Sequence, residues 1–213
     1  MPAVAEFALA AGVLTIIPGP DTLLTVRTAI ASGRANALAA GAGICTALLG
    51  WGCAAGLGLT AALAAAPDLY LTLRWIGAAY LAWMGLHAII RGARWPAEAA
   101  AAGTAATEAG QVPRQRRWPS YLRGVLNCAS NPKIGIFYLA LFPQFIARGE
   151  ALLPASLVLA AIHTTETMVW LGLLAVLGGR LGLMLRRRAA RRWADRVSGA
   201  AFLAFAARLV AGG

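Results

Sequence analysis

The sequence predicts an all-α protein that crosses a membrane six times. Of its 213 residues, 60% are hydrophobic and 13% are charged, and the mean hydropathy is +0.68. A soluble domain needs about twice that charged fraction to wet its surface. The apolar stretches are each about 17–28 residues long. That length suits membrane helices and is far too long for the strands of about ten residues found in membrane barrels.

Six apolar stretches form one transmembrane domain over residues 1–213, and proline interrupts the first and the fourth. They cover about residues 4–28, 36–63, 69–90, 120–146, 152–179 and 197–213. A polar connection at about 92–119 separates two halves, about 1–91 and 120–213. A half with three crossings ends on the opposite side of the membrane, so the second half is expected to be an inverted repeat of the first, as in many secondary transporters.

Two further features bear on the repeat and on its boundaries. Tryptophan follows threonine by five residues in both the second and the fifth stretch, as Thr46–Trp51 and Thr165–Trp170.

The sixth stretch reaches only about 25 Å as a helix, slightly less than the hydrocarbon core. For the basic segment before it, residues 180–196, we expect a solvated loop whose positive charges fix the topology. The alternative is an amphipathic helix that lies on the lipid surface.

The distribution of arginine predicts the orientation of the chain. The net charge is +11, and fifteen arginines fall on one side of a six-span topology against three on the other. The positive-inside rule places the arginine-rich loops in the cytoplasm and both termini outside. Membrane lipid is the expected partner of these loops, and no nucleic acid is expected, because no aromatic-basic platform accompanies the charge. The three cysteines lack metal-ligand spacing, so no metal or other cofactor is expected.

The two proline interruptions each carry an ionisable residue inside apolar sequence. The first break is Pro18-Gly19-Pro20-Asp21, and the second is Asn131-Pro132-Lys133. Proline removes a backbone donor and clashes with the carbonyl four residues earlier, so carbonyls at Leu14, Ile16 and Cys128 should be freed. Charges within a membrane are costly and usually mark a pathway or an ion pair.

These polar groups together match the charges of a zwitterion. Asp21 can take an ammonium group, and Lys133 a carboxylate. Asn127 and Asn131, four residues apart on one helix face, add donors and acceptors beside Lys133. Freed carbonyls would complete the ammonium site. A purely structural ion pair between Asp21 and Lys133, or kinked helices in a dry bundle, are the alternatives.

At these breaks the chain resembles the LysE/RhtB family of bacterial amino-acid exporters. The resemblance rests on Ile17 to Asp21, on Gly124 to Phe145 with its Asn131-Pro132-Lys133 motif, and on Gly77 to Gly85. It implies a multi-pass efflux carrier in the bacterial cytoplasmic membrane, not an enzyme. Its substrate would be a small amino acid or a derivative, and its driving force the proton gradient or the membrane potential. The resemblance does not identify the substrate.

Glu166, in the segment His163-Thr164-Thr165-Glu166 of the fifth stretch, is not expected from the family motifs. A second carboxylate inside the membrane suggests a site of proton coupling or a preference for a cationic substrate. A glutamate hydrogen-bonded to neighbouring helices is the alternative.

Other classes of function fit the sequence less well. An ion or metal exporter of the same superfamily would need more intramembrane acids or histidines than are present. A membrane enzyme would need a nucleophile with its base, or a metal set. A non-transporting structural subunit would not need two charged breaks. The pairs Gly52/Gly56 and Gly178/Gly182 permit close helix packing, either within one chain or across a homodimer.

Overall fold

The part of the chain that the computed structural model describes consists of helices and the short connections between them. The described residues are 2–16, 19–65, 116–146, 150–185 and 188–211, with single residues and short groups between 72 and 90. The labelled helices are α1 (Pro2–Ile16), α2 (Pro20–Ser32), α3 (Arg34–Ala65), α6 (Arg117–Ala129), α7 (Pro132–Phe145), α8 (Leu152–Leu185) and α9 (Arg188–Ala211). No strand occurs in these ranges, so the all-α prediction is confirmed for them.

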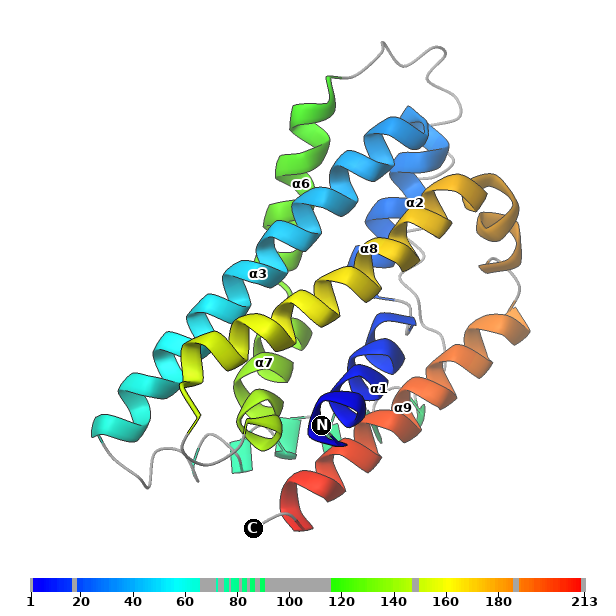
Figure 1. Ribbon diagram of the computed structural model, residues 1–213. Coiled ribbons are helices and arrows are strands. Elements are labelled where there is room, and N and C mark those ends of the chain that lie inside the picture. Colours follow the sequence, from blue (N-terminus) through cyan, green and yellow to red (C-terminus); the bar gives the residue numbers. More distant parts are fainter. Residues whose placement is uncertain are drawn as a thin grey trace.

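The two longest helices are also the clearest membrane spans. Arg34–Gly58 of α3 and Leu152–Leu177 of α8 are long and apolar enough to cross a bilayer. Helices α1 and α2 pass the same test as a pair bent by 51°, which gives a third candidate span among the described residues. These three correspond to the second, fifth and first predicted stretches. Helices α3 and α8 pack against each other along the length of the molecule (Figure 1).

The boundaries predicted around the sixth stretch were wrong. Helix α8 continues to Leu185 and α9 begins at Arg188, so most of the basic segment 180–196 is helical. Hydropathy ends a span at its first charges, whereas alanine, leucine and arginine all favour a helical backbone well beyond them. The 24 residues of α9 span about 36 Å, enough for a bilayer core. The polar connection was also drawn too long, since α6 begins at Arg117; residues 92–115 lie outside the described part.

Both predicted breaks are true helix ends. The first separates α1 from α2, and Pro20 stands in the first turn of α2 after an extended Gly19; Pro18 lies outside the described residues. The second follows Ala129, and α7 starts again at Pro132. Proline fits the first helical position because the N–H that it lacks would have no partner there. Asn131 caps α7, its side-chain oxygen accepting from the Lys133 backbone N–H at 3.1 Å.

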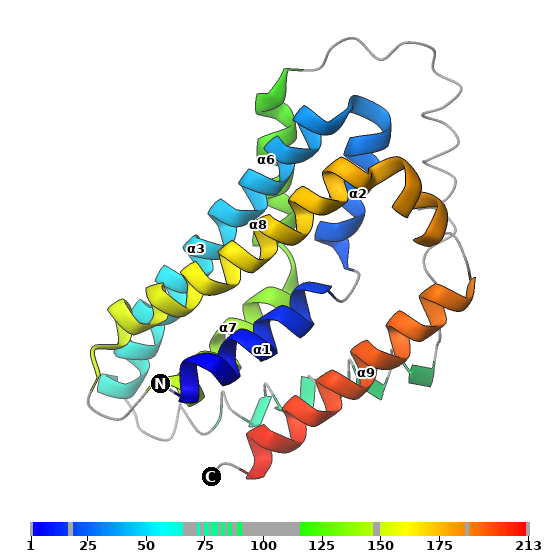
Figure 2. The same ribbon diagram turned by 45° about the vertical axis from the view of Figure 1, so that its right-hand side comes forward.

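The two broken pairs cross the molecule in opposite directions. In Figures 1 and 2, α1 and α2 rise from the end where the chain begins, whereas α6 and α7 descend toward it. Both labelled termini lie at that same end. A positive φ of 82° at Gly33 turns the chain sharply between α2 and α3, a conformation that glycine adopts without steric cost.

Small residues and aromatic rings hold the helices around the breaks. The Gly52/Gly56 pair packs inside the chain, against Ala160 and Leu153 of α8, so it is an intramolecular contact. Phe7 of α1 is fully buried against a cluster of α7 rings, with its centroid 5.3 Å from that of Phe142. These contacts fix α1 against α7 and α3 against α8 on either side of the breaks.

Candidate functional site

The two breaks meet through the side chain of Asp21. This residue lies in the first turn of α2, and each of its carboxylate oxygens accepts a side-chain amide N–H. Asn127 Nδ2, from the last turn of α6, donates to Oδ1 at 2.6 Å. Asn131 Nδ2, from the cap of α7, donates to Oδ2 at 3.4 Å. Hydrogen bonds to a charged acceptor are stronger than neutral ones, so the two asparagines hold this carboxylate in place.

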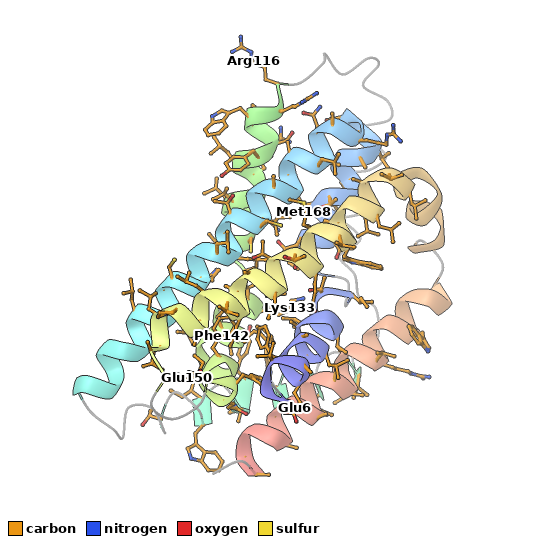
Figure 3. All side chains as sticks on the ribbon, in the orientation of Figure 1. Glu6, Arg116, Lys133, Phe142, Glu150 and Met168 are labelled. Atoms are coloured by element: carbon orange, nitrogen blue, oxygen red, sulfur yellow. The ribbon has the colours of Figure 1, made fainter. Side chains whose placement is uncertain are left out.

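Lys133 joins the same centre to the end of α1. Its Nζ donates to the backbone carbonyl of Leu14 at 3.4 Å. Carbonyls in the last turn of a helix lack an intrahelical donor, and the negative end of the helix dipole attracts a cation. Among the described residues, Lys133 therefore binds a helix end and makes no direct ion pair with Asp21. Figure 3 shows Lys133 near the middle of the bundle, beside α1.

The asparagines and the freed carbonyls do not lie where the sequence placed them. Asn127 and Asn131 contact Asp21, although the sequence grouped them with Lys133. The Cys128 carbonyl accepts from Asn131 N at 3.1 Å and from Trp51 Nε1 at 3.4 Å, so protein donors already satisfy it. The Leu14 carbonyl accepts from Lys133. In this structure long-range contacts therefore supply protein donors to two of the carbonyls that were expected to complete an ammonium site, and local sequence cannot reveal such donors.

A small cavity lies beside the two charges. Its volume is about 20 Å³, room for about one water and too little for a whole amino acid. A molecule of that size would fit there only if the surrounding helices moved apart. The polar part of the lining consists of Thr15, Asp21, Thr22, Lys133, His163, Thr167 and Trp170.

The predicted site residues separate into three groups in the structure. Gly19, Asp21 and Lys133 line the cavity. Asn127 and Asn131 are not part of its lining and support Asp21 instead. Pro20 and Pro132 begin helices and have exposed side chains. The prolines therefore act through the backbone, by ending one helix and starting the next beside the charge.

Helix α8 contributes cavity residues that the sequence did not assign to a site. His163 is 2% exposed, and its Nδ1 lies 3.1 Å from the Tyr138 hydroxyl. Thr167 Oγ1 lies 3.3 Å from Thr15 Oγ1 of α1. His163, Thr167 and Trp170 are spaced four and then three residues apart, which places them on one helix face. That spacing could have grouped these three residues from the sequence. The stretch is apolar on all sides, however, so the sequence does not show which face points inward.

Glu166 lies near this centre but outside the cavity lining. Its carboxylate is against α1, where a Cβ on Gly12 would lie 3.8 Å from Glu166 Oε2. That oxygen is buried and has no hydrogen-bond partner among the described residues. Glu166 therefore faces the interface between α1 and α8, opposite Gly12, which lies one turn before Thr15 in α1.

The fold and the site define a helical membrane protein built around two broken helices whose charged breaks meet in its centre. Residues 13–213 match the family model of the LysE type translocator. The chain belongs to this family of translocators, as the two motifs indicate. No solved structure matches the chain significantly.

Relatives in several bacteria match most of the chain. A threonine efflux protein of Salmonella typhi is 31% identical over 196 residues, which cover 91% of this chain and 90% of the relative. A homoserine/homoserine lactone efflux protein of Salmonella typhimurium is 27% identical over 203 residues, covering 95% and 93%. An uncharacterized membrane protein of Bacillus subtilis, YrhP, is 30% identical over 164 residues, 75% of each chain. The family and these relatives support amino-acid export by a membrane protein.

Proposed function

We propose that the protein is a secondary active exporter of a small, zwitterionic amino acid, driven by the proton gradient or the membrane potential. The observation that carries the proposal is the pairing of opposite charges at one cavity. Asp21 and Lys133 come from the two halves of the chain, each from the first turn after a broken helix, and both line the same small space. A zwitterion needs both charges within reach of one small molecule.

Each charge keeps capacity for a substrate. A carboxylate offers about four lone-pair sites, and the described residues fill two of those on Asp21. An ammonium group has three donors, and one of those on Lys133 is directed to Leu14. We assign the substrate ammonium to Asp21 and the substrate carboxylate to Lys133. Asn127 and Asn131 hold Asp21, and the breaks at Gly19, Pro20 and Pro132 position both charges.

We infer that the two halves are inverted repeats and that transport alternates access to the cavity. Two features support this proposal. The broken pairs α1–α2 and α6–α7 run in opposite directions, and the breaks contact each other through Asp21 and the asparagines. Inverted repeats that rock about a central site open it to one side at a time. A cavity of this size would have to widen to bind a substrate, as such rocking allows.

Among amino acids, we infer that those with a hydroxyl group best match the polar groups that line the cavity. Thr15, Thr22 and Thr167 supply hydroxyls to the lining, and a hydroxyl both donates and accepts hydrogen bonds. The relatives named for threonine and for homoserine suggest the same class of substrate.

Efflux from cells that overexpress the chain tests this function. Cells are loaded with a panel of neutral, cationic and acidic amino acids, and release is compared with that from cells carrying the empty vector. We expect faster release of threonine and homoserine than of cationic amino acids. Unchanged release of every member of the panel would contradict the function.

We propose that Glu166 carries the coupling proton, because an unpartnered carboxylate oxygen at a helix interface gains most from protonation. Glu166→Gln is then expected to leave substrate release measurable but to abolish its dependence on an imposed proton gradient. Proteoliposomes with and without the gradient provide the measurement. Glu150→Gln, at an exposed position, is the control and should behave as the wild type. Unchanged coupling in Glu166→Gln would assign this residue to helix packing.

We infer that both termini face away from the cytoplasm. Arginine is concentrated in the loops on the other side of the predicted six-span topology. Both termini lie at one end of the molecule. A periplasmic reporter fused after Gly213 is expected to be active, and a fluorescent protein at the same position to stay dark. A fluorescent fusion together with an inactive periplasmic reporter would place the C-terminus in the cytoplasm and contradict the six-span count.

A further inference from the structure

Two tryptophans occupy matching places in the two halves of the chain. Trp51 on α3 follows Thr46 by five residues, and Trp170 on α8 follows Thr165 by five. Each threonine hydroxyl donates to the carbonyl four residues earlier, at 3.0 Å in α3 and 2.8 Å in α8. The two tryptophans thus follow threonines that make the same local hydrogen bond.

Each of these tryptophans lies beside a different break. Trp51 Nε1 donates to the Cys128 carbonyl at the break between α6 and α7. Its ring packs so closely on α7 that a Cβ on Gly135 would lie 2.7 Å from it. Trp170 instead lines the cavity together with Gly19 and Asp21 of the break between α1 and α2.

The two indole groups differ in their hydrogen bonding. Trp51 has its acceptor, whereas Trp170 Nε1 is buried and has no partner among the described residues. A buried donor without an acceptor is costly and rare in native proteins. At the wall of a cavity that also holds two charged groups, the missing acceptor is most simply supplied by a bound molecule.

The chemistry of the cavity identifies that acceptor. An indole N–H only donates, so it cannot bind an ammonium group. An amino acid whose ammonium group lies on Asp21 directs its carboxylate to Lys133, which lines the same space as Trp170. We propose that Trp170 donates its indole N–H to the substrate carboxylate alongside Lys133. This inference rests on the function proposed above and adds a second carboxylate-binding residue from α8.

Binding of two matched probes to the purified full chain tests the role of Trp170. L-Threonine and L-threonine methyl ester share the ammonium and hydroxyl groups, but only threonine has a carboxylate. The dissociation constant of each is measured by displacement of labelled threonine from protein in nanodiscs. We expect the wild type to prefer threonine. In Trp170→Phe, threonine should bind roughly tenfold more weakly, the usual cost of losing one bond to a charged group. Binding of the ester should weaken by a clearly smaller factor, because its carbonyl oxygen is an uncharged acceptor.

Trp51→Phe is the matched control, because it removes the same N–H from the equivalent position of the other half. It should change the affinities for threonine and the ester by the same factor. If Trp170→Phe inserts poorly, incorporation of benzothienylalanine at position 170 replaces the N–H by sulfur and keeps the shape of the ring.

Three results would overturn the assignment. Equal weakening of both probes in Trp170→Phe would show that the indole packs against the substrate or binds its hydroxyl. Unchanged binding of threonine would remove Trp170 from the site while the proposed function stands. Wild-type protein that binds and exports no amino acid would reject the proposed function, and the role of Trp170 with it.

Discussion

Asp21→Asn and Lys133→Met are each expected to abolish amino-acid export while the protein still inserts into the membrane. Either change removes one of the two charges that line the cavity, so one end of a zwitterion loses its counter-charge in a low-dielectric environment. Asn at position 21 keeps an oxygen for the amide of Asn127, which limits the structural damage. Efflux and membrane yield are measured for both variants, with exposed Glu150→Gln as the control.

The double variant separates substrate binding from a structural ion pair. If Asp21 and Lys133 only stabilise each other, each single change leaves an unpaired buried charge and costs about 3–5 kcal/mol, and the double variant recovers. If they bind substrate, the double variant stays inactive. We expect no recovery, since Lys133 donates to Leu14 and Asp21 accepts from two asparagines. A double variant that regains export would reject the binding role.

Gly43→Ala and Gly124→Ala are expected to lower the free energy of unfolding the most among single glycine changes in α3 and α6. A Cβ on Gly124 would overlap the Ala40 carbonyl, and one on Gly43 would overlap the Tyr121 carbonyl. Backbone atoms cannot rotate away, so the two helices would have to separate. Such overpacking typically costs about 1–3 kcal/mol. It would also displace Asn127, one turn beyond Gly124, from Asp21.

Glycines that face open space provide the comparison. Gly50 on α3 and Gly172 on α8 have no atom within 4 Å of an added Cβ. Gly50→Ala and Gly172→Ala should be neutral or stabilising, by up to about 1 kcal/mol, because alanine favours a helix more than glycine does. Thermal unfolding in detergent compares the four variants. Equal stability of Gly124→Ala and Gly50→Ala would contradict the close crossing of α3 and α6.

The class of protein and the places where its helices break can both be predicted from the sequence. Both properties are local. The length and apolar character of α3 and α8 follow from composition alone, and the fixed φ and missing N–H of proline favour the first turn of a helix. The sequence therefore predicted the helix starts at Pro20 and Pro132, and the charge that follows each. It did not predict where α8 ends and where α9 begins, because helix-forming residues continue past the first arginines.

Which polar groups meet depends on how distant segments pack together. Asn127 and Asn131 hold Asp21 from more than 100 positions away in the chain, Lys133 donates to the end of α1, and His163 and Trp170 line the cavity from α8. In a soluble helix, the polar side would have revealed the outward face. A membrane helix is apolar toward both lipid and core, so its sequence carries little information about orientation. The partner of each buried polar group is set by packing between distant segments.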